Sequence, residues 1–146
     1  MTVHRFAFGA AAVLSAFLLA GCASSIWRIT PAAPGRLAKS GKYVAFSIEG
    51  MNSGVYLFYY IPLWSGSPTT PNENSIDIFR HQVDDKAIFR MFDKANKRMR
   101  TDGVEEIVID HRSVGFWTLW IVWKRSVHGR ALLVSHKPIT TKKRFK

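Results

Sequence analysis

Several segments of the sequence alternate between apolar and polar side chains, a pattern typical of half-buried strands. Residues 42–49 place apolar side chains at alternate positions. The sequence GMNSG at 50–54 is rich in small residues and predicts a turn. Residues 55–64 are rich in β-branched and aromatic residues and predict a second strand that ends near Pro62. Together these segments predict a β-hairpin.

The clearest helical pattern lies in residues 84–100. Asp84 suits an N-cap, and Asp85 suits the positive end of the helix dipole. Apolar side chains recur at spacings of three and four residues and form one stripe: Ile88, Met91, Phe92, Ala95 and Met99. Gly103 predicts the end of the helix.

The remaining elements are extended. Residues 75–80 predict either a short strand or an irregular lead into the helix, and residues 104–110 predict a strand. Residues 116–125 are apolar on both faces and residues 129–136 continue in extended form, while residues 126–129 predict either a hairpin turn or a bulge. A helix with one apolar stripe must bury it on a sheet. The sequence therefore predicts an α+β domain, with one amphipathic helix packed on a mostly antiparallel sheet of about five strands.

The N-terminus carries the parts of an export signal. His4 and Arg5 begin it, residues 6–20 form an apolar run without a charge, and Gly21 is a small residue at the end of the run. The run is shorter than the ~20 residues that a helix needs to span a bilayer. A permanent membrane helix is therefore the weaker alternative.

The sequence Leu19-Ala20-Gly21-Cys22 resembles the lipobox of bacterial lipoproteins. The resemblance implies cleavage between Gly21 and Cys22, a thioether-linked diacylglycerol on Cys22 and usually an N-acyl chain such as palmitate. Cys22 is the only cysteine of the sequence, so it has no disulfide partner within the chain. An ordinary signal peptide followed by a chance cysteine is the alternative. Because no Asp follows Cys22, the resemblance implies the outer membrane, facing the periplasm, in a Gram-negative source, and the cytoplasmic membrane in a Gram-positive one.

The expected organisation has four segments. They are a lipoprotein signal peptide (1–21), a lipidated N-terminus with a flexible tether (22–41), a single α+β domain (42–136) and a basic C-terminal tail (137–146). The tether is expected because prolines and a glycine interrupt regular structure, and a coil of this length spans roughly 25 Å. The order of elements also resembles that of small α+β domains of uncharacterised bacterial lipoproteins, a likeness of pattern that implies no activity.

The chain is strongly basic, with 21 Lys and Arg against 10 Asp and Glu and a net charge of +11. Such an excess favours an anionic partner. Export would make that partner anionic lipid, lipopolysaccharide or a wall polymer rather than nucleic acid. The candidate contacts lie in the second half of the helix and in the tail: Lys94, Lys97, Arg98, Arg100, Lys142, Lys143, Arg144 and Lys146. A merely solvated face is the simpler alternative.

The titratable residues have no spacing typical of a catalytic or metal site. No two of the histidines of the mature chain are four residues apart on the helix: His81, His111, His128 and His136. Neighbours on a strand point to opposite faces, which separates Asp110 from His111 and Glu105 from Glu106. We therefore expect no catalytic residue, metal or cofactor. A cell-wall or lipid hydrolase would need two of four residues to converge in a cleft: His81, Glu106, Asp110 and His111.

Three tryptophans alternate in the apolar run near the C-terminus, with Trp117 and Trp123 on one side and Trp120 on the other. Core packing is the simpler interpretation, and an exposed partner face is the alternative. The sequence thus predicts a membrane-anchored envelope lipoprotein that is a non-enzymatic binding or accessory module. One alternative is a structural subunit of an envelope protein complex, and the rival of another class is a hydrolase that acts on cell-wall or lipid material.

Replacement of the candidate lipid-attachment residue tests the anchor. We expect Cys22→Ser to abolish acylation and to leave an unprocessed precursor, because the lipid would be attached through the thiol. Mass spectrometry of the wild type and the variant measures both effects. A mature N-terminus at another residue, or a wild-type Cys22 without lipid, would contradict the prediction.

Overall fold

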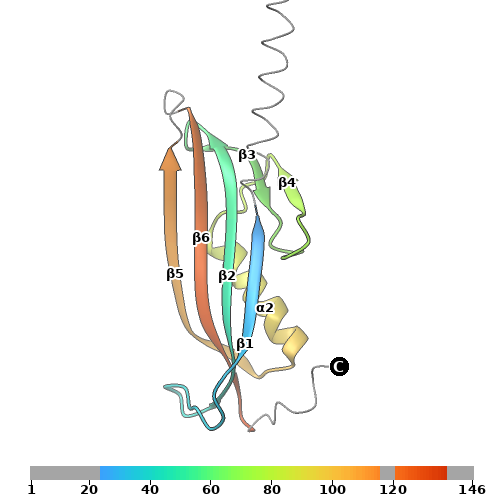
Figure 1. Ribbon diagram of the computed structural model, residues 1–146, viewed down its shortest axis with the longest axis vertical. Coiled ribbons are helices and arrows are strands. Elements are labelled where there is room, and N and C mark those ends of the chain that lie inside the picture. Colours follow the sequence, from blue (N-terminus) through green and yellow to red (C-terminus); the bar gives the residue numbers. More distant parts are fainter. Residues whose placement is uncertain (1–23, 116–120, 138–146) are drawn as a thin grey trace, which may run out of the picture.

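The computed structural model describes residues 24–115 and 121–137, which form one antiparallel sheet with a helix packed on one face (Figure 1). The strands follow the order β4-β3-β2-β6-β5, and β1 also pairs with β2. The elements are β1 (Ser25–Pro31), β2 (Tyr43–Leu57), β3 (Ile61–Gly66), β4 (Ile76–Ile78), α2 (Asp85–Met99), β5 (Gly103–Gly115) and β6 (Val122–Ser135). The predicted α+β class, with a helix on an antiparallel sheet, is confirmed, and the sheet has six strands rather than about five.

Strand β2 is the centre of the sheet and is longer than predicted. One of its edges pairs with β6 over its whole length, from Tyr43 to Leu57. The other edge is shared by two strands placed end to end, β1 opposite Phe46–Asn52 and β3 opposite Gly54–Leu57. The turn predicted at 50–54 is therefore wrong, because this segment lies inside β2.

The small residues at 50–54 serve close packing instead of a turn. A Cβ on Gly50 would lie 3.3 Å from atoms of both Met91 and Phe92 of the helix. A Cβ on Gly54 would lie 2.9 Å from the Trp64 carbonyl oxygen of β3. The chain reverses direction later, after Leu57, where Phe58 and Tyr59 both have positive φ.

The segment expected to be a flexible tether contains strand β1. Ser25–Pro31 pairs in register with β2, and Trp27 is buried in the main core. Asn72, in the loop between β3 and β4, covers the outer edge of β1. Its side-chain oxygen accepts a hydrogen bond from the Trp27 N–H (3.0 Å), and its side-chain nitrogen donates one to the Trp27 carbonyl (3.1 Å). The paired part of the chain therefore includes Ser25–Pro31 and does not begin at residue 42.

Helix α2 begins as predicted. The Asp84 side chain accepts a hydrogen bond from the Ala87 N–H at 2.8 Å, which caps the first turn. The predicted stripe is buried apart from the last residue, Met99, which is partly buried against the core. The predicted end at Gly103 is wrong, because Arg100 adopts the left-handed conformation that ends the helix and Gly103 begins β5.

Strand β6 runs without interruption through the segment for which a hairpin turn or a bulge was expected. Residues 126–129 pair in regular register with Ser53–Gly50 of β2, so neither alternative is correct. The irregularity lies in β5, where the register with β6 shifts between Glu105 and Val108 and Glu106 has a positive φ.

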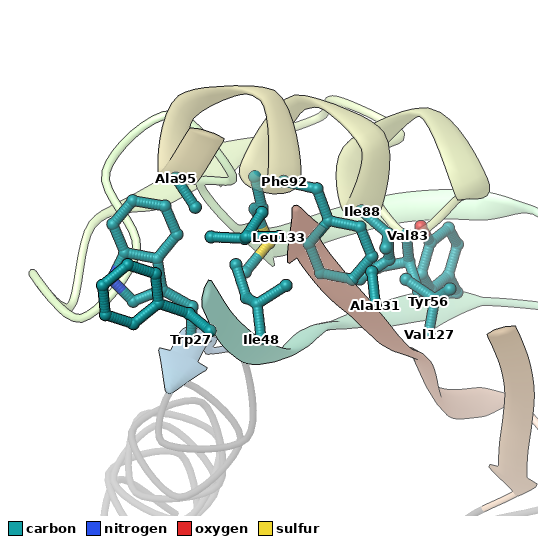
Figure 2. Packing of buried hydrophobic residues seen from close by; sticks show 12 residues of the cluster. Trp27, Ile48, Tyr56, Val83, Ile88, Phe92, Ala95, Val127, Ala131 and Leu133 are labelled. Atoms are coloured by element: carbon teal, nitrogen blue, oxygen red, sulfur yellow. The ribbon is translucent and has the colours of Figure 1, made fainter. Parts of the chain in front are cut away.

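The main core lies between α2 and the sheet (Figure 2). Ile88 and Phe92 point from the helix towards Ala131 and Leu133 of β6, and Trp27 closes the core below Ala95. The closest contact involves Gly129 of β6. A Cβ at this position would lie 2.3 Å from Cγ2 of Ile88 and 2.9 Å from Cζ of Phe92. Gly129 pairs with Gly50, so two glycines face each other under the helix.

The close contact of the helix with Gly129 predicts a clear effect of adding one methyl group. We expect Gly129→Ala to lower the free energy of unfolding by about 1–3 kcal/mol, because the helix must shift to admit the Cβ. Gly103→Ala is the matched control, since its Cβ would meet Val134 Cγ2 at an ordinary 3.8 Å. Its effect should stay within about 0.5 kcal/mol. Urea unfolding curves measure both variants, and equal losses would contradict the prediction.

Candidate functional site

The face of the sheet opposite α2, called here the helix-free face, carries the candidate site. Side chains alternate between the two faces along a strand. In β2, Ile48 packs in the core beneath α2 and the Cα–Cβ direction of Gly50 points at the helix. Glu49, Met51 and Ser53 therefore lie on the helix-free face. Residues paired with them share this face, because directly opposed residues of antiparallel strands point the same way.

A shallow groove of about 520 Å³ lies on this face. It crosses four strands, from β1 through β2 and β6 to β5. The side chains that line it are both apolar and charged: Ile26, Arg28, Glu49, Met51, Val108, Asp110, Arg112, His128 and Arg130. The groove therefore combines aliphatic surface with three guanidinium groups and two carboxylates.

The three arginines of the groove differ in their partners. Arg112 Nε lies 3.2 Å from a carboxylate oxygen of Asp110, and Arg130 Nε lies 3.9 Å from one of Glu49. Both pairs are largely exposed, so each contributes little to stability. Among the described residues, no carboxylate lies within ion-pair distance of Arg28, which is exposed on β1 opposite Glu49 of β2. Its guanidinium group is available to an anionic ligand.

His128 is the titratable group whose pKa the groove changes. Burial lowers the pKa of His128 below its usual value, and the charge of Arg112 lowers it further. Asp110 opposes this effect and Arg130 adds to it. The neutral imidazole is therefore favoured, which leaves the arginines as the cations of the groove.

The first described residue, Ser24, lies over the helix-free face. Its N–H donates to Oγ of Ser53 (3.0 Å), and its carbonyl accepts from the Ser53 N–H (2.8 Å). A Cβ on Gly66 of β3 would lie 2.3 Å from the Ser24 carbonyl carbon, so the chain crosses directly above Gly66. Ile76 pairs with Gly66 and Ile78 with Trp64, which places both isoleucines on the same face.

The cations predicted as anionic-surface contacts lie apart from this groove. Lys94, Lys97 and Arg98 are exposed on α2, and Arg100 follows its last turn. Lys94 Nζ donates to the Thr69 carbonyl, and Lys97 Nζ lies 2.6 Å from Asp93. The sheet separates these cations from the helix-free face. The other predicted contacts lie outside the described residues: Lys142, Lys143, Arg144 and Lys146.

Of the three tryptophans predicted as a possible partner face, one lies within the described residues. Trp123 is partly buried against the main core, and its ring meets that of Tyr59 edge to face at 5.3 Å. Trp123 thus contributes to packing. Trp117 and Trp120 lie outside the described residues, as do the candidate cleavage and lipidation residues Gly21 and Cys22.

The residues that a hydrolase would need are dispersed. Of the four, Asp110 lines the groove, whereas His111 Nε2 lies 2.6 Å from Asp85 on the helix side, as their alternation predicted. His81 Nδ1 forms a hydrogen bond with the Tyr56 hydroxyl at 2.8 Å. Glu106 accepts from the Lys39 N–H at 3.1 Å.

The two neighbouring glutamates of β5 do not diverge as expected. Glu105 contacts Ser40 Oγ (2.5 Å) and Lys42 Nζ (3.0 Å), so both glutamates hold the same loop. The register shift of β5 at this point explains the common direction. The Ser40 hydroxyl lowers the pKa of Glu105, and Lys42 lowers it further.

The described residues include no group of three or more His, Cys, Asp or Glu that is arranged to hold a metal ion. Helical structure in this part of the chain lacks the length and apolar character needed to cross a bilayer. Comparison of the chain with known protein families, curated proteins and solved structures yields no match.

The environment of His128 in the groove predicts that the free energy of unfolding depends on pH. The unfolded state binds a proton more readily than the folded state, because the pKa of His128 is lowered on folding. The free energy of unfolding should therefore fall as the pH drops below about 6.5 towards the folded pKa. We expect His128→Gln to lose this part of the profile. Urea unfolding from about pH 7.5 to about pH 5 measures it, and parallel profiles would contradict the prediction.

Proposed function

We propose that this protein is a lipid-anchored protein of the bacterial envelope and a non-enzymatic binding module that uses the helix-free face as its binding surface. The observation that carries the proposal is the groove, in which Arg28 forms no ion pair among the described residues and shares its face with exposed Ile26. An amphiphile with an anionic head satisfies both features, because the head pairs with the guanidinium group while apolar parts cover the aliphatic side chains.

The segment of sequence that precedes Ser24 supports the lipid anchor. The lipobox-like segment ends at Cys22, and one residue separates Cys22 from Ser24. In a Gram-negative source the lipid would hold the domain on the periplasmic side of the outer membrane. The ligand would then be anionic lipid, including the lipid part of lipopolysaccharide, and not nucleic acid.

The dispersal of the titratable residues favours binding over hydrolysis. A nucleophile and its base must lie within hydrogen-bond reach of each other. Among the described residues of the groove, Asp110 and His128 face each other across β5 and β6 but share no hydrogen bond. Three arginines line the same groove, and guanidinium groups suit recognition of an anion.

A structural subunit of an envelope complex is the second candidate, favoured by one feature of the sheet. Strand β5 spans Gly103–Gly115 and is the last strand in the sheet order, so its outer edge has no strand partner among the described residues. Val108 and Val114 are exposed along it. A strand of another protein could pair there.

Lipid binding in mixed micelles tests the proposed function. The lipidated mature protein in non-ionic detergent should show a higher thermal midpoint when phosphatidylglycerol, and not phosphatidylcholine, is added. Arg28→Gln should raise the half-saturating phosphatidylglycerol concentration roughly tenfold, because it removes a hydrogen bond between charged groups. Arg98→Gln is the matched control, since it removes the same charge from an exposed position of α2.

Two results would contradict the proposed function. Equal midpoints with both lipids would show that the groove does not recognise the anionic head. An equal loss in Arg28→Gln and Arg98→Gln would show that net charge, and not the groove, attracts the lipid.

A further inference from the structure

The place where the chain enters the fold limits the orientation of the domain on a membrane. Ser24 is fixed above the helix-free face by two hydrogen bonds to Ser53 and by its contact with Gly66. Cys22 is two residues away, a reach of at most about 7 Å for an extended chain. A lipid on Cys22 would therefore enter the bilayer beside this face, not at the end of a long tether.

The helix-free face has the chemistry of a surface that lies on an anionic bilayer. Aliphatic side chains are exposed on it, from β4 at one side of the sheet to β5 at the other: Ile76, Ile78, Ile26, Val108 and Val114. Four cations share the face, namely Arg28, Lys124, Arg112 and Arg130, against the carboxylates Glu49 and Asp110. A third carboxylate of this face, Glu105, is paired with Lys42. Aliphatic side chains enter the interface of a bilayer, while each cation near an anionic leaflet strengthens binding.

The cations of the helix lie on the other side of the sheet. Lys97 and Arg98 are exposed on α2, and Phe89 on the same helix is also 47% exposed. A bilayer that touches Ile78 on the helix-free face is therefore separated from these residues by the sheet and the core. This separation allows the two faces to be tested independently.

We propose that the helix-free face docks side-on onto the anionic phospholipid surface of the same membrane that holds the lipid on Cys22. The inference rests on the proposed function and specifies its ligand as the headgroup layer of that membrane. Docking places β4 and the groove against the headgroups and leaves α2 directed away from the bilayer. The lipid anchor and the sheet face act together, so that the effective concentration of headgroups at the groove is high.

Site-specific labelling of the lipidated protein in vesicles tests the orientation. Ile78→Cys and Phe89→Cys each supply a single free thiol, because the only native cysteine would be blocked by its thioether. Ile78 is 65% exposed and Phe89 47% exposed, so both positions tolerate a label. A fluorophore at position 78 should be quenched by a lipid-borne quencher in vesicles that contain phosphatidylglycerol, and a fluorophore at position 89 should not.

The contribution of the groove is measured in the same vesicles. Arg28→Gln should shift the equilibrium between docked and undocked domains roughly fivefold towards the undocked state, read as lower quenching at position 78. Arg98→Gln should leave the quenching unchanged. High salt or phosphatidylcholine alone should release the face, because both weaken the attraction to the anionic headgroups.

The outcomes of these experiments distinguish failure of the docking inference from failure of the proposed function on which it rests. Equal quenching at positions 78 and 89, or stronger quenching at position 89, overturns the docking, while a phosphatidylglycerol effect in micelles leaves the proposed function standing. Docking that survives Arg28→Gln but not Arg98→Gln assigns the contact to the helix and also overturns the inference. A mature protein without lipid on Cys22 overturns both proposals.

Discussion

The fold depends on the close approach of α2 to the paired glycines Gly50 and Gly129. Because neither residue carries a Cβ, Ile88 and Phe92 lie directly on the backbone of the sheet. The contact lies between the two longest strands, β2 and β6, which carry the core residues along most of their length. One helix can cover only one face of a sheet of this size. The exposed and charged groove on the other face is therefore a direct consequence of the architecture.

The separation of charge is a second consequence of this architecture. The net charge of +11 is a sum over the sequence and contains no information about direction. In the fold, the sheet divides the basic residues between the helix side, represented by Arg98, and the helix-free face, represented by Arg28. Only the second group shares the face over which Ser24 lies. The basic residues of the two faces therefore differ in where they lie on the fold more than in how much charge they carry.

Local signals in the sequence were sufficient for the helix, because the Asp84 cap and the apolar stripe act within a few residues. They failed at 50–54, where small residues reflect contact with a helix far along the chain. The actual turn after Leu57 contains Phe58 and Tyr59 at positive φ, without the glycine or asparagine that marks such turns. The groove was not predictable, because it requires the register of four strands. A local sign of it was the spacing of two residues between Asp110 and Arg112 in β5 and between His128 and Arg130 in β6.

Strand β1 gives the domain a mechanical property that a tether would not. Its hydrogen bonds to β2 run across the strand direction, and they join Ser25–Pro31 to Phe46–Asn52. If the chain before Ser24 is fixed in a membrane, a pull along β1 shears all of these bonds together. Rupture then requires them to break at once and not one after another. The sheet would then resist tension at its point of attachment, and the load would pass through the strand that carries Ile26 and Arg28.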